Sequence, residues 1–278
     1  MKYNIENNKI KITDINDFNL QKTFECGQCF RWNKDKNGAY VGIAYGKPTR
    51  LYQENNSIII TSTAEDFEKT LREYFDLDRD YNEIMEKVSI DDYMKRATSY
   101  GAGLRLLRQE TWEALCSFII SQNNNIPRIK RIISTLCERF GDNITFNGDN
   151  YYTFPSAKTI ASLKPSDLAP LRCGYRADYI ISAAGAVASG DIDLDALAKK
   201  SPIEARTALK RLHGVGDKVA DCVLLFGLHM LDAFPIDVWV KRVVEEQYGK
   251  NFDPGVFSPY AGVAQQYMFY YARNHGNT

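Results

Sequence analysis

Short segments that alternate apolar and polar residues make up the N-terminal part of the chain. From about residue 1 to 75 they are separated by clusters of Asn, Asp, Gly and Lys, which is typical of β-strands joined by turns. The predicted strands cover residues 9–13, 30–32, 39–45, 50–53 and 57–61. The pattern therefore predicts an N-terminal antiparallel sheet domain, which we assign to residues 1–80.

From about residue 80 onward, the apolar residues recur with the period of a helix. The predicted helices cover residues 111–122, 126–140, 177–189, 202–212, 218–228, 238–248 and 257–274. Their ends carry typical residues: Pro202 follows the cap Ser201, Gly141 follows a C-terminus, and Asp237 precedes a helix as a cap. The chain is therefore predicted to be an α+β protein with a helical bundle over residues 81–278.

Composition and charge indicate an ordinary globular chain. Of its 278 residues, 44% are hydrophobic and 25% charged, and 35 basic residues balance 35 acidic ones. A neutral chain does not coat nucleic acid by bulk electrostatics, so any contact with DNA must be local. No stretch approaches the roughly 18 to 20 apolar residues of a membrane span, and we expect a soluble intracellular protein. The candidate basic positions, which are more often simply a solvated helix face, are Arg105, Arg108, Arg128, Lys130, Arg131, Arg139, Lys210, Arg211 and Lys218.

Six cysteines are scattered through the chain, at positions 26, 29, 116, 137, 173 and 222. Without a secretory signal, reduced thiols are expected rather than a disulfide framework. Cys26 and Cys29 form a CxxC pair, but no second pair completes the ligand set of a structural zinc site. We therefore expect no metal bound by side chains.

A glycine-rich turn joins two of the predicted helices, in the sequence ARTALKRLHGVGDKVADCVLLF at 205–226. Gly214 and Gly216 let backbone N–H groups approach a phosphate, and the second helix offers its positive N-terminal end to the same anion. By itself GVG could be only a tight turn. The longer pattern L-x-G-V-G-x-K-x-A resembles the helix–hairpin–helix motif of DNA-binding proteins.

Lys218 and Asp237 are the candidate catalytic pair. Lys218 falls in the first turn of the second helix, where the helix dipole and partial burial both favour a neutral amine, which is a nucleophile. Attack on C1′ of a nucleotide would expel the base and leave a Schiff base, from which β-elimination cuts the strand. Asp237 could stabilise positive charge on the sugar, although an N-cap worth about 1 kcal/mol explains it equally well.

With these residues in view, the chain resembles the 8-oxoguanine DNA glycosylases of the helix–hairpin–helix superfamily over essentially its whole length. The resemblance implies a bifunctional glycosylase and AP lyase that acts as a monomer on double-stranded DNA containing 8-oxoguanine, preferentially opposite cytosine. The stretches that carry it are CGQCFRW at 26–32, LRLLRQETWEALCSFIISQNNNIPRI at 104–129, CGYRADYI at 173–180, HGVGDKVADC at 213–222, FPIDV at 234–238 and AGVAQQYMF at 261–269.

The same resemblance implies a role for each matching residue. Lys218 is the nucleophile, Asp237 its essential carboxylate, and Gly27 presents its carbonyl to the N7 hydrogen that 8-oxoguanine has and guanine lacks. The flipped base is clamped between Cys222 and Phe269 and read along its Watson–Crick edge by Gln265. Without the resemblance, Cys222 and Phe269 would simply be core residues.

Four further residues match the part of the family that enters the duplex. Asn123 fills the gap left by the flipped base, and Tyr175 pries the stack apart. Arg128 and Arg176 donate to the unpaired cytosine, whose O2 and N3 are acceptors. On pattern alone, the NNN run at 123–125 is only a turn with a cap.

The resemblance also bears on cofactors, and one residue departs from it. No cofactor is required, and an iron–sulfur cluster is not expected, because no cysteine follows Cys222. The family's hairpin can hold a cation on its backbone carbonyls. Trp239 stands where eukaryotic members carry a histidine, and that histidine's role is not transferred to it.

Two alternative functions are weighed against this one. A monofunctional alkylpurine glycosylase uses water as its nucleophile and has no use for Lys218. A non-catalytic helix–hairpin–helix module would grip the DNA backbone and would not need four residues together, namely Lys218, Asp237, Gln265 and Phe269.

Overall fold

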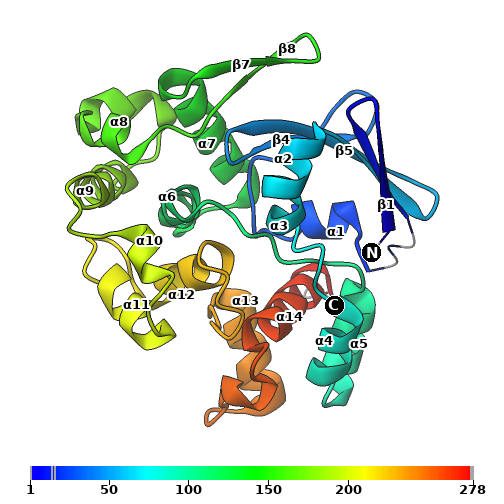
Figure 1. Cartoon of the computed structure of the whole chain (residues 1–278). Coiled ribbons are helices and arrows are strands. Elements are labelled where there is room, and N and C mark those ends of the chain that lie inside the picture. Colours follow the sequence, from blue (N-terminus) through cyan, green and yellow to red (C-terminus); the bar gives the residue numbers. More distant parts are fainter. Residues whose placement is uncertain (1, 14, 16, 276–278) are drawn as a thin grey trace.

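The N-terminal part of the chain folds into a six-stranded antiparallel sheet, in a computed structural model that describes residues 2–13, 15 and 17–275 (Figure 1). The strands lie in the order β1-β2-β6-β5-β4-β3. Their bounds are β1 Lys2–Glu6, β2 Lys9–Thr13, β3 Asn33–Lys34, β4 Tyr40–Ala44, β5 Lys47–Glu54 and β6 Ser57–Thr61. The predicted α+β class, with the sheet first and helices after it, is confirmed.

Alternation and turn chemistry explain the sheet. In β2, Ile10 and Ile12 are fully buried while the alternating residues Lys9 and Lys11 face solvent. Asn7 and Asn8 both have positive φ, which is the geometry of a tight hairpin turn whose twist matches that of its strands. The predicted strands 9–13 and 57–61 are confirmed with the same bounds, whereas β1 was not predicted.

The predicted strand at residues 30–32 is wrong, because this segment is irregular and only the short β3 follows it. Phe30 and Trp32 are both buried. The Trp32 indole stacks on Phe24 with ring centroids 4.5 Å apart and donates to the Tyr74 hydroxyl over 2.9 Å. The aromatic pattern therefore reflects core packing rather than strand pairing.

The rest of the chain is mainly helical. The longer helices are α4 Tyr81–Val88, α5 Asp92–Gly101, α6 Thr111–Ser121, α7 Ile126–Phe140, α9 Arg176–Ala188, α11 Pro202–Leu209, α12 Asp217–Phe226 and α14 Ala261–His275. The shorter ones are α1 Leu20–Glu25, α2 Ala64–Asp66, α3 Arg72–Tyr74, α8 Ala157–Ala161, α10 Leu194–Leu197 and α13 Val238–Val243. The predicted helix 126–140 is confirmed with its bounds, and each of the other six predicted helices has a helix at its core. The hairpin of β7 Asn143–Phe146 and β8 Asp149–Tyr152 was not predicted, and it projects from the helical part in Figure 1.

Helix α6 forms the centre of the helical part. Residues 114–120 are all buried, and the helix packs against α7, α9 and α12. Figure 1 shows α6 between α9 on one side and the sheet domain on the other. The C-terminal end of α6 and the N-terminal end of α12 are consequently held in fixed positions, and both supply residues to the cavity described below.

The segment between α5 and α6 ties the helices to the sheet domain and corrects one expectation. Arg105, which we grouped with the basic surface positions, is only 2% exposed. Its guanidinium pairs with Asp17 at 2.5 Å, donates to the carbonyl of Asp76 over 2.6 Å, and lies over the ring of Tyr81. Charge alone could not reveal this, because its partners are distant in the sequence.

A buried carboxylate, Asp76, lies at the same junction between the helices and the sheet domain. It pairs with Arg79 at 2.6 Å and Arg108 at 3.2 Å, accepts from the Tyr81 hydroxyl over 3.0 Å, and lies 3.3 Å from His229, which follows α12. Burial alone would raise the pKa of Asp76, but His229 and Arg79 hold it well below its usual range. Burial also lowers the pKa of His229, against the opposing effect of Asp76.

Asp76→Asn is expected to lower the free energy of unfolding at pH 7 by about 2 to 3 kcal/mol, because charge-assisted hydrogen bonds are lost in a buried place. The pKa of Asp76 in the folded protein lies below the unfolded value of about 3.9. The wild-type advantage is therefore fully present above about pH 4 and shrinks as the pH falls toward the folded value. Urea unfolding at pH 7 and pH 3 measures both effects.

The matched control is Asp78→Asn, since the Asp78 side chain is 63% exposed and pairs with Arg72. This change is expected to shift the free energy of unfolding by less than about 1 kcal/mol. If the two substitutions change the free energy of unfolding equally, the charge of Asp76 does not stabilise the contact between the helices and the sheet domain.

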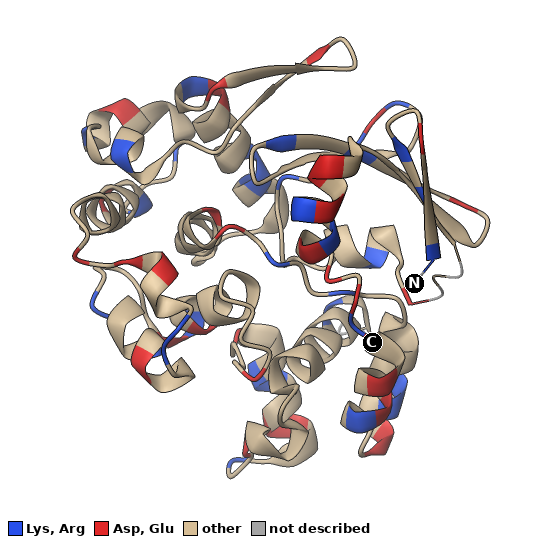
Figure 2. Cartoon of the chain, viewed as in Figure 1, with Lys and Arg blue, Asp and Glu red and all other residues tan. Residues whose placement is uncertain are grey.

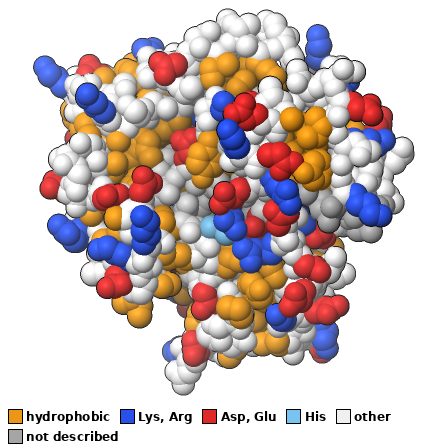
Figure 3. Space-filling model, viewed as in Figure 1, with side chains coloured by type: hydrophobic (Ala, Val, Ile, Leu, Met, Phe, Trp, Pro, Cys, Tyr) orange, Lys and Arg blue, Asp and Glu red, His pale blue; other side chains and the backbone are white. Residues whose placement is uncertain are grey.

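Charges of both signs are interspersed over the surface. Figure 2 shows acidic and basic residues side by side on α4 and α5, where Lys87 pairs with Glu83 at 2.6 Å. The face drawn in Figure 3 likewise mixes both signs with apolar patches. Within the described residues, no helix is long and apolar enough to cross a membrane.

The division of the chain into two domains at residue 80 stays a prediction.

Candidate active site

A cavity of about 710 Å³ brings together residues from distant parts of the chain. Its walls come from the segment after α1, the turn between α6 and α7, the start of α12, the start of α13, and α14. Six of the predicted site residues line it: Gly27, Asn123, Gly216, Lys218, Asp237 and Phe269. Its lining also includes Trp239, the residue that departs from the family pattern.

Lys218 lies in the first turn of α12, as predicted from the sequence. Its amine donates to the Ser121 hydroxyl over 3.1 Å and lies 5.2 Å from the centre of the Phe118 ring. The preceding residue, Asp217, instead faces outward and pairs with Lys210 at 2.5 Å. The first turn of α12 therefore separates a solvent-exposed ion pair from an amine directed into the cavity.

Asp237 caps helix α13. An N-cap was the simpler of the two roles that the sequence allowed for this residue. Its Oδ1 accepts from the backbone N–H groups of Trp239 at 3.0 Å and Val240 at 2.9 Å. Burial raises the pKa of Asp237, while those bonds and the nearby Lys218 oppose the shift. Because Oδ1 accepts both capping bonds, the carboxylate can cap the helix and still direct Oδ2 and its negative charge into the cavity.

Gly27 has φ of +87°, a conformation that other residues rarely adopt. A Cβ here would lie 3.3 Å from both Phe269 and Ile126, so the cavity wall also favours glycine. The neighbouring Gln28 is fully buried, and its amide binds the carbonyls of Thr23 and Arg105 over 2.8 and 2.7 Å. Gln28 thereby fixes the backbone beside Gly27, a role that we did not predict.

Cys222 and Gln265 do not line the cavity. They are 3% and 4% exposed, and burial raises the pKa of Cys222 to about 11. Within the described part of the chain, Gln265 Oε1 is buried without a hydrogen-bond partner. The adjacent Gln266, which we did not predict, donates to the carbonyl of Cys26 over 3.1 Å and so braces the same segment as Gln28.

The four residues predicted to enter the duplex, Asn123, Arg128, Tyr175 and Arg176, lie close together and are called the wedge below. Asn123 has a positive φ of 45° and donates to the Tyr175 hydroxyl over 3.4 Å. Tyr175 is 46% exposed, which suits a side chain that enters a duplex. Arg128 is exposed and donates to the carbonyl of Arg172 over 2.9 Å.

Arg176 differs from the other wedge residues because it is only 4% exposed. Its guanidinium donates to the carbonyls of Gln122, Asn123 and Cys173, with the Asn123 bond 3.0 Å long. It thus satisfies carbonyls at the C-terminal end of α6. In this conformation its donors are directed at the protein backbone.

The hairpin between α11 and α12 lies beside the wedge, on a concave surface of about 760 Å³ that includes Asn123 and Tyr175. Gly214 has φ of +81°, and a Cβ there would come within 2.2 Å of the Tyr179 ring. Gly216 has no such neighbour, so its lack of a side chain leaves the start of α12 open to a ligand. The carbonyl of Gly214 accepts from the Gln122 side chain over 3.0 Å.

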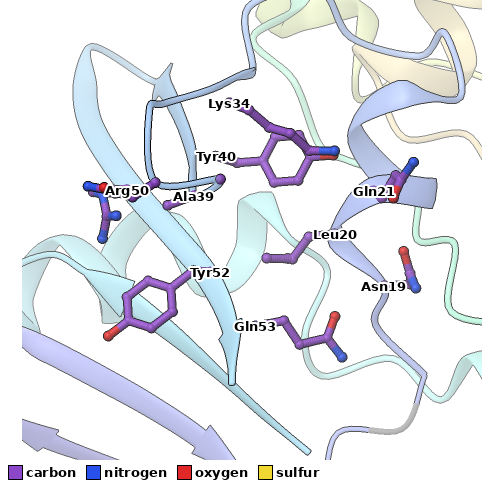
Figure 4. A pocket seen from close by; sticks show the side chains of 11 residues that line it. Asn19, Leu20, Gln21, Lys34, Ala39, Tyr40, Arg50, Tyr52 and Gln53 are labelled. Carbon is purple, nitrogen blue, oxygen red and sulfur yellow. The ribbon is translucent and has the colours of Figure 1, made fainter. Parts of the chain in front are cut away.

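In the described ranges of the chain, neither the cysteines nor the cavity of the sheet domain offers a second set of the predicted site residues. All six thiols are free and buried, and burial raises the pKa of Cys26 to about 11. Among the described residues, no three His, Cys, Asp or Glu side chains cluster as metal ligands. The sheet domain carries a cavity of about 660 Å³ (Figure 4), where Lys34 pairs with Glu25 at 3.0 Å and Arg50 with Asp35 at 2.7 Å. Both cations are neutralised there, and none of the predicted site residues lines it.

Two family models together cover most of the chain. Residues 9–115 match the N-terminal domain of 8-oxoguanine DNA glycosylase, and residues 116–254 match the HhH-GPD superfamily of base excision DNA repair proteins. The chain belongs to the 8-oxoguanine DNA glycosylase family. It is therefore an N-glycosylase/DNA lyase of the helix–hairpin–helix superfamily, and the resemblance inferred from its motifs is confirmed.

Individual members of this family agree with that assignment. The N-glycosylase/DNA lyase of Saccharomyces cerevisiae is 35% identical over 255 residues, which is 82% of this chain and 68% of the yeast protein. The structure of MBOgg1 with a low-affinity DNA ligand has a TM-score of 0.94 at 44% identity, covering 99% of this chain and 100% of that one. The Clostridium acetobutylicum 8-oxoguanine glycosylase/lyase, bound to double-stranded DNA with cytosine opposite 8-oxoguanine, also has a TM-score of 0.94, at 34% identity and 99% coverage of both chains.

Proposed function

We propose that this glycosylase/lyase removes 8-oxoguanine paired with cytosine from double-stranded DNA and cuts the strand through a Schiff base on Lys218. The observation that carries the proposal is the shared cavity, in which an amine, a carboxylate and the backbone of Gly27 lie together. A helix–hairpin–helix module that only gripped DNA would not need this cavity. A glycosylase that activates water would not need the amine.

The amine and the carboxylate divide the chemistry between them. Attack by neutral Lys218 forms a bond to C1′ as the bond to the base breaks, and the departing base takes up the proton that the lysine releases. Breaking of the bond between C1′ and O4′ opens the sugar and gives the Schiff base. Loss of a proton from C2′, which is acidic beside the Schiff base, then expels the phosphate at C3′ with the electron pair of the C3′–O bond. Asp237 places a negative charge close to the positive charge that develops on the sugar.

Lesion selectivity rests on the carbonyl of Gly27. This carbonyl can accept a hydrogen bond from the protonated N7 of 8-oxoguanine, whereas the unprotonated N7 of guanine would face it as a second acceptor. An unpaired buried acceptor costs about 1 to 3 kcal/mol, which is enough to discriminate. Gln28 and Gln266 support this recognition of N7, because their hydrogen bonds fix the backbone on either side of Gly27.

A clamp around the flipped base completes the proposed lesion pocket. Phe269 already lines the cavity and would cover one face of the base. Cys222 would cover the other face, and Gln265 would satisfy its unpartnered Oε1 on the base edge. Because Cys222 and Gln265 lie behind the cavity surface, the pocket must open slightly as the base enters.

The proposed enzyme acts as a monomer and needs no cofactor. Gly214 and Gly216 would bind a DNA phosphate at the N-terminal end of α12, because that end carries partial positive charge. A cation on the hairpin carbonyls is part of the proposal as an aid to phosphate binding, not to the chemistry.

A single duplex substrate tests the proposed function. The chain is incubated with DNA carrying one 8-oxoguanine opposite cytosine, beside the same duplex with guanine at that position. We expect base release and strand cleavage from the lesion duplex alone. Equal action on both duplexes would contradict the role of Gly27, and inactivity of folded protein on both would overturn the proposed substrate.

Arg128→Ala is expected to narrow the difference in excision rate between cytosine and other bases opposite the lesion by about ten-fold, which corresponds to the loss of one good hydrogen bond to a base. Arg128 is the wedge arginine able to exchange a single bond, the one to the Arg172 carbonyl, for the cytosine acceptors. Single-turnover excision from duplexes with each of the four opposite bases measures the change.

The matched control is Arg131→Ala, which removes an exposed cation from the next turn of the same helix. It is expected to leave the order and spread of the four rates unchanged. If Arg128→Ala gives the wild-type profile as well, Arg128 does not read the opposite base.

A further inference from the structure

One side chain of helix α6 contacts the amine of Lys218 directly. Lys218 Nζ donates to Ser121 Oγ over 3.1 Å, and Ser121 Oγ donates in turn to the carbonyl of Phe118 over 2.8 Å. The single hydroxyl proton is therefore used by that carbonyl, and the lone pairs of Oγ face the amine. Ser121 can accept from Lys218 without donating to the lone pair that the nucleophile needs.

The same helix supplies a second contact to the amine. Phe118 lies three residues before Ser121, so the two side chains fall on one face of α6. The Phe118 ring centre is 5.2 Å from Nζ, and both residues line the cavity beside Lys218. The amine is thus held between a hydroxyl oxygen and an aromatic ring.

This face of α6 is a rigid support. The helix is buried along residues 114–120, and Arg176 binds the carbonyls of Gln122 and Asn123 just beyond its end. Ser121 needs only one side-chain torsion to place its oxygen, whereas lysine has a flexible four-carbon stem. The position of the amine is therefore set by the helix rather than by the lysine itself.

We propose that Ser121 is a positioning residue, which holds the Lys218 amine in line with C1′ of the flipped nucleotide. The inference rests on the proposed function, since it takes Lys218 as the attacking group. Attack requires the reacting atoms to lie about 3 to 3.5 Å apart with their orbitals aligned. Without the serine oxygen, the amine can turn toward the carboxylate of Asp237 instead of toward C1′.

Ser121→Ala tests the proposal through the rate of the chemical step. We expect the single-turnover rate of 8-oxoguanine excision and the rate of borohydride trapping to fall about 10- to 100-fold, the cost of a misplaced reacting group. The Kd for the lesion duplex should stay at the wild-type value, because Ser121 acts on the lysine. Ser121→Thr keeps the hydroxyl and its bond to the helix carbonyl, and it should restore most of the rate.

Ser117→Ala is the matched control, because Ser117 is a buried serine one turn earlier in α6. It should excise at the wild-type rate, and thermal unfolding of all three variants shows whether each is folded. An excision rate for Ser121→Ala equal to wild type, or a loss that Ser121→Thr does not restore, overturns the positioning role. If wild type itself forms no trapped adduct, Lys218 is not the nucleophile, and the proposed function fails before the role of Ser121 is reached.

Discussion

Lys218→Gln is expected to abolish Schiff-base formation and to lower strand cleavage by a factor on the order of a thousand or more, because an amide is not a nucleophile. The glutamine side chain is shorter but can still donate to the Ser121 hydroxyl, so the cavity should keep its shape. Binding of a duplex with 8-oxoguanine opposite cytosine should therefore persist. Borohydride trapping and denaturing gels measure the chemistry, and fluorescence anisotropy measures the Kd.

The hairpin supplies a matched control for this prediction. Lys210→Gln removes a lysine that pairs with Asp217 at the exposed end of α12. This variant should still form the trapped adduct, with weaker DNA binding as its main change. Cleavage by Lys218→Gln at the wild-type rate would show that another group attacks the sugar.

The sequence predicted those parts of the fold and site that depend on local patterns. Alternation in residues 9–13 placed Ile10 and Ile12 in the core, and helical periodicity placed Lys218 in the first turn of α12. The cap at Asp237 was equally local. In each case the residue's place in its strand or helix is set by neighbours within about one turn or one strand.

The contacts that support the site are not local, and these were missed. Gln28 binds Arg105, Gln266 binds Cys26, and Lys218 binds Ser121, each across at least 77 residues of sequence. A pattern along the chain shows that such residues are polar, but it does not show which polar groups meet. Only the resemblance to the family predicted that Gly27 and Phe269 lie in the same pocket.

The burial of charged residues was missed for the same reason. Arg105 and Arg176 are arginines, a residue type expected on a DNA-binding surface. Both are nevertheless buried, and their guanidinium groups donate to backbone carbonyls. A guanidinium can satisfy several carbonyls at once, so burial of an arginine depends on irregular backbone that periodicity does not predict. The basic residues left on the surface, such as Arg128, are therefore the better candidates for contact with DNA.

Asp237→Asn separates the two roles that the structure gives to one carboxylate. Asparagine caps a helix about as well as aspartate, so the bonds to Trp239 and Val240 should persist and stability should change little. The negative charge is lost, however, and excision should fall by about 100- to 1000-fold, the usual effect of removing a group that stabilises a charged transition state. Single-turnover excision and urea unfolding of the variant measure the two effects separately.

The pH dependence of excision distinguishes a catalytic charge from a structural cap. Burial raises the pKa of Asp237, so protonation of the wild-type carboxylate begins at a higher pH than for an exposed aspartate. The wild-type rate should therefore decline as the pH falls toward that raised value, while Asp237→Asn, which has no carboxylate to protonate there, should lack this decline. Asp80→Asn, which alters the cap of α4 far from the cavity lining, should keep the wild-type rate and profile. If Asp237→Asn excises 8-oxoguanine as fast as wild type, the cap alone accounts for the residue, and positive charge on the sugar must be stabilised by the phosphates of the DNA itself.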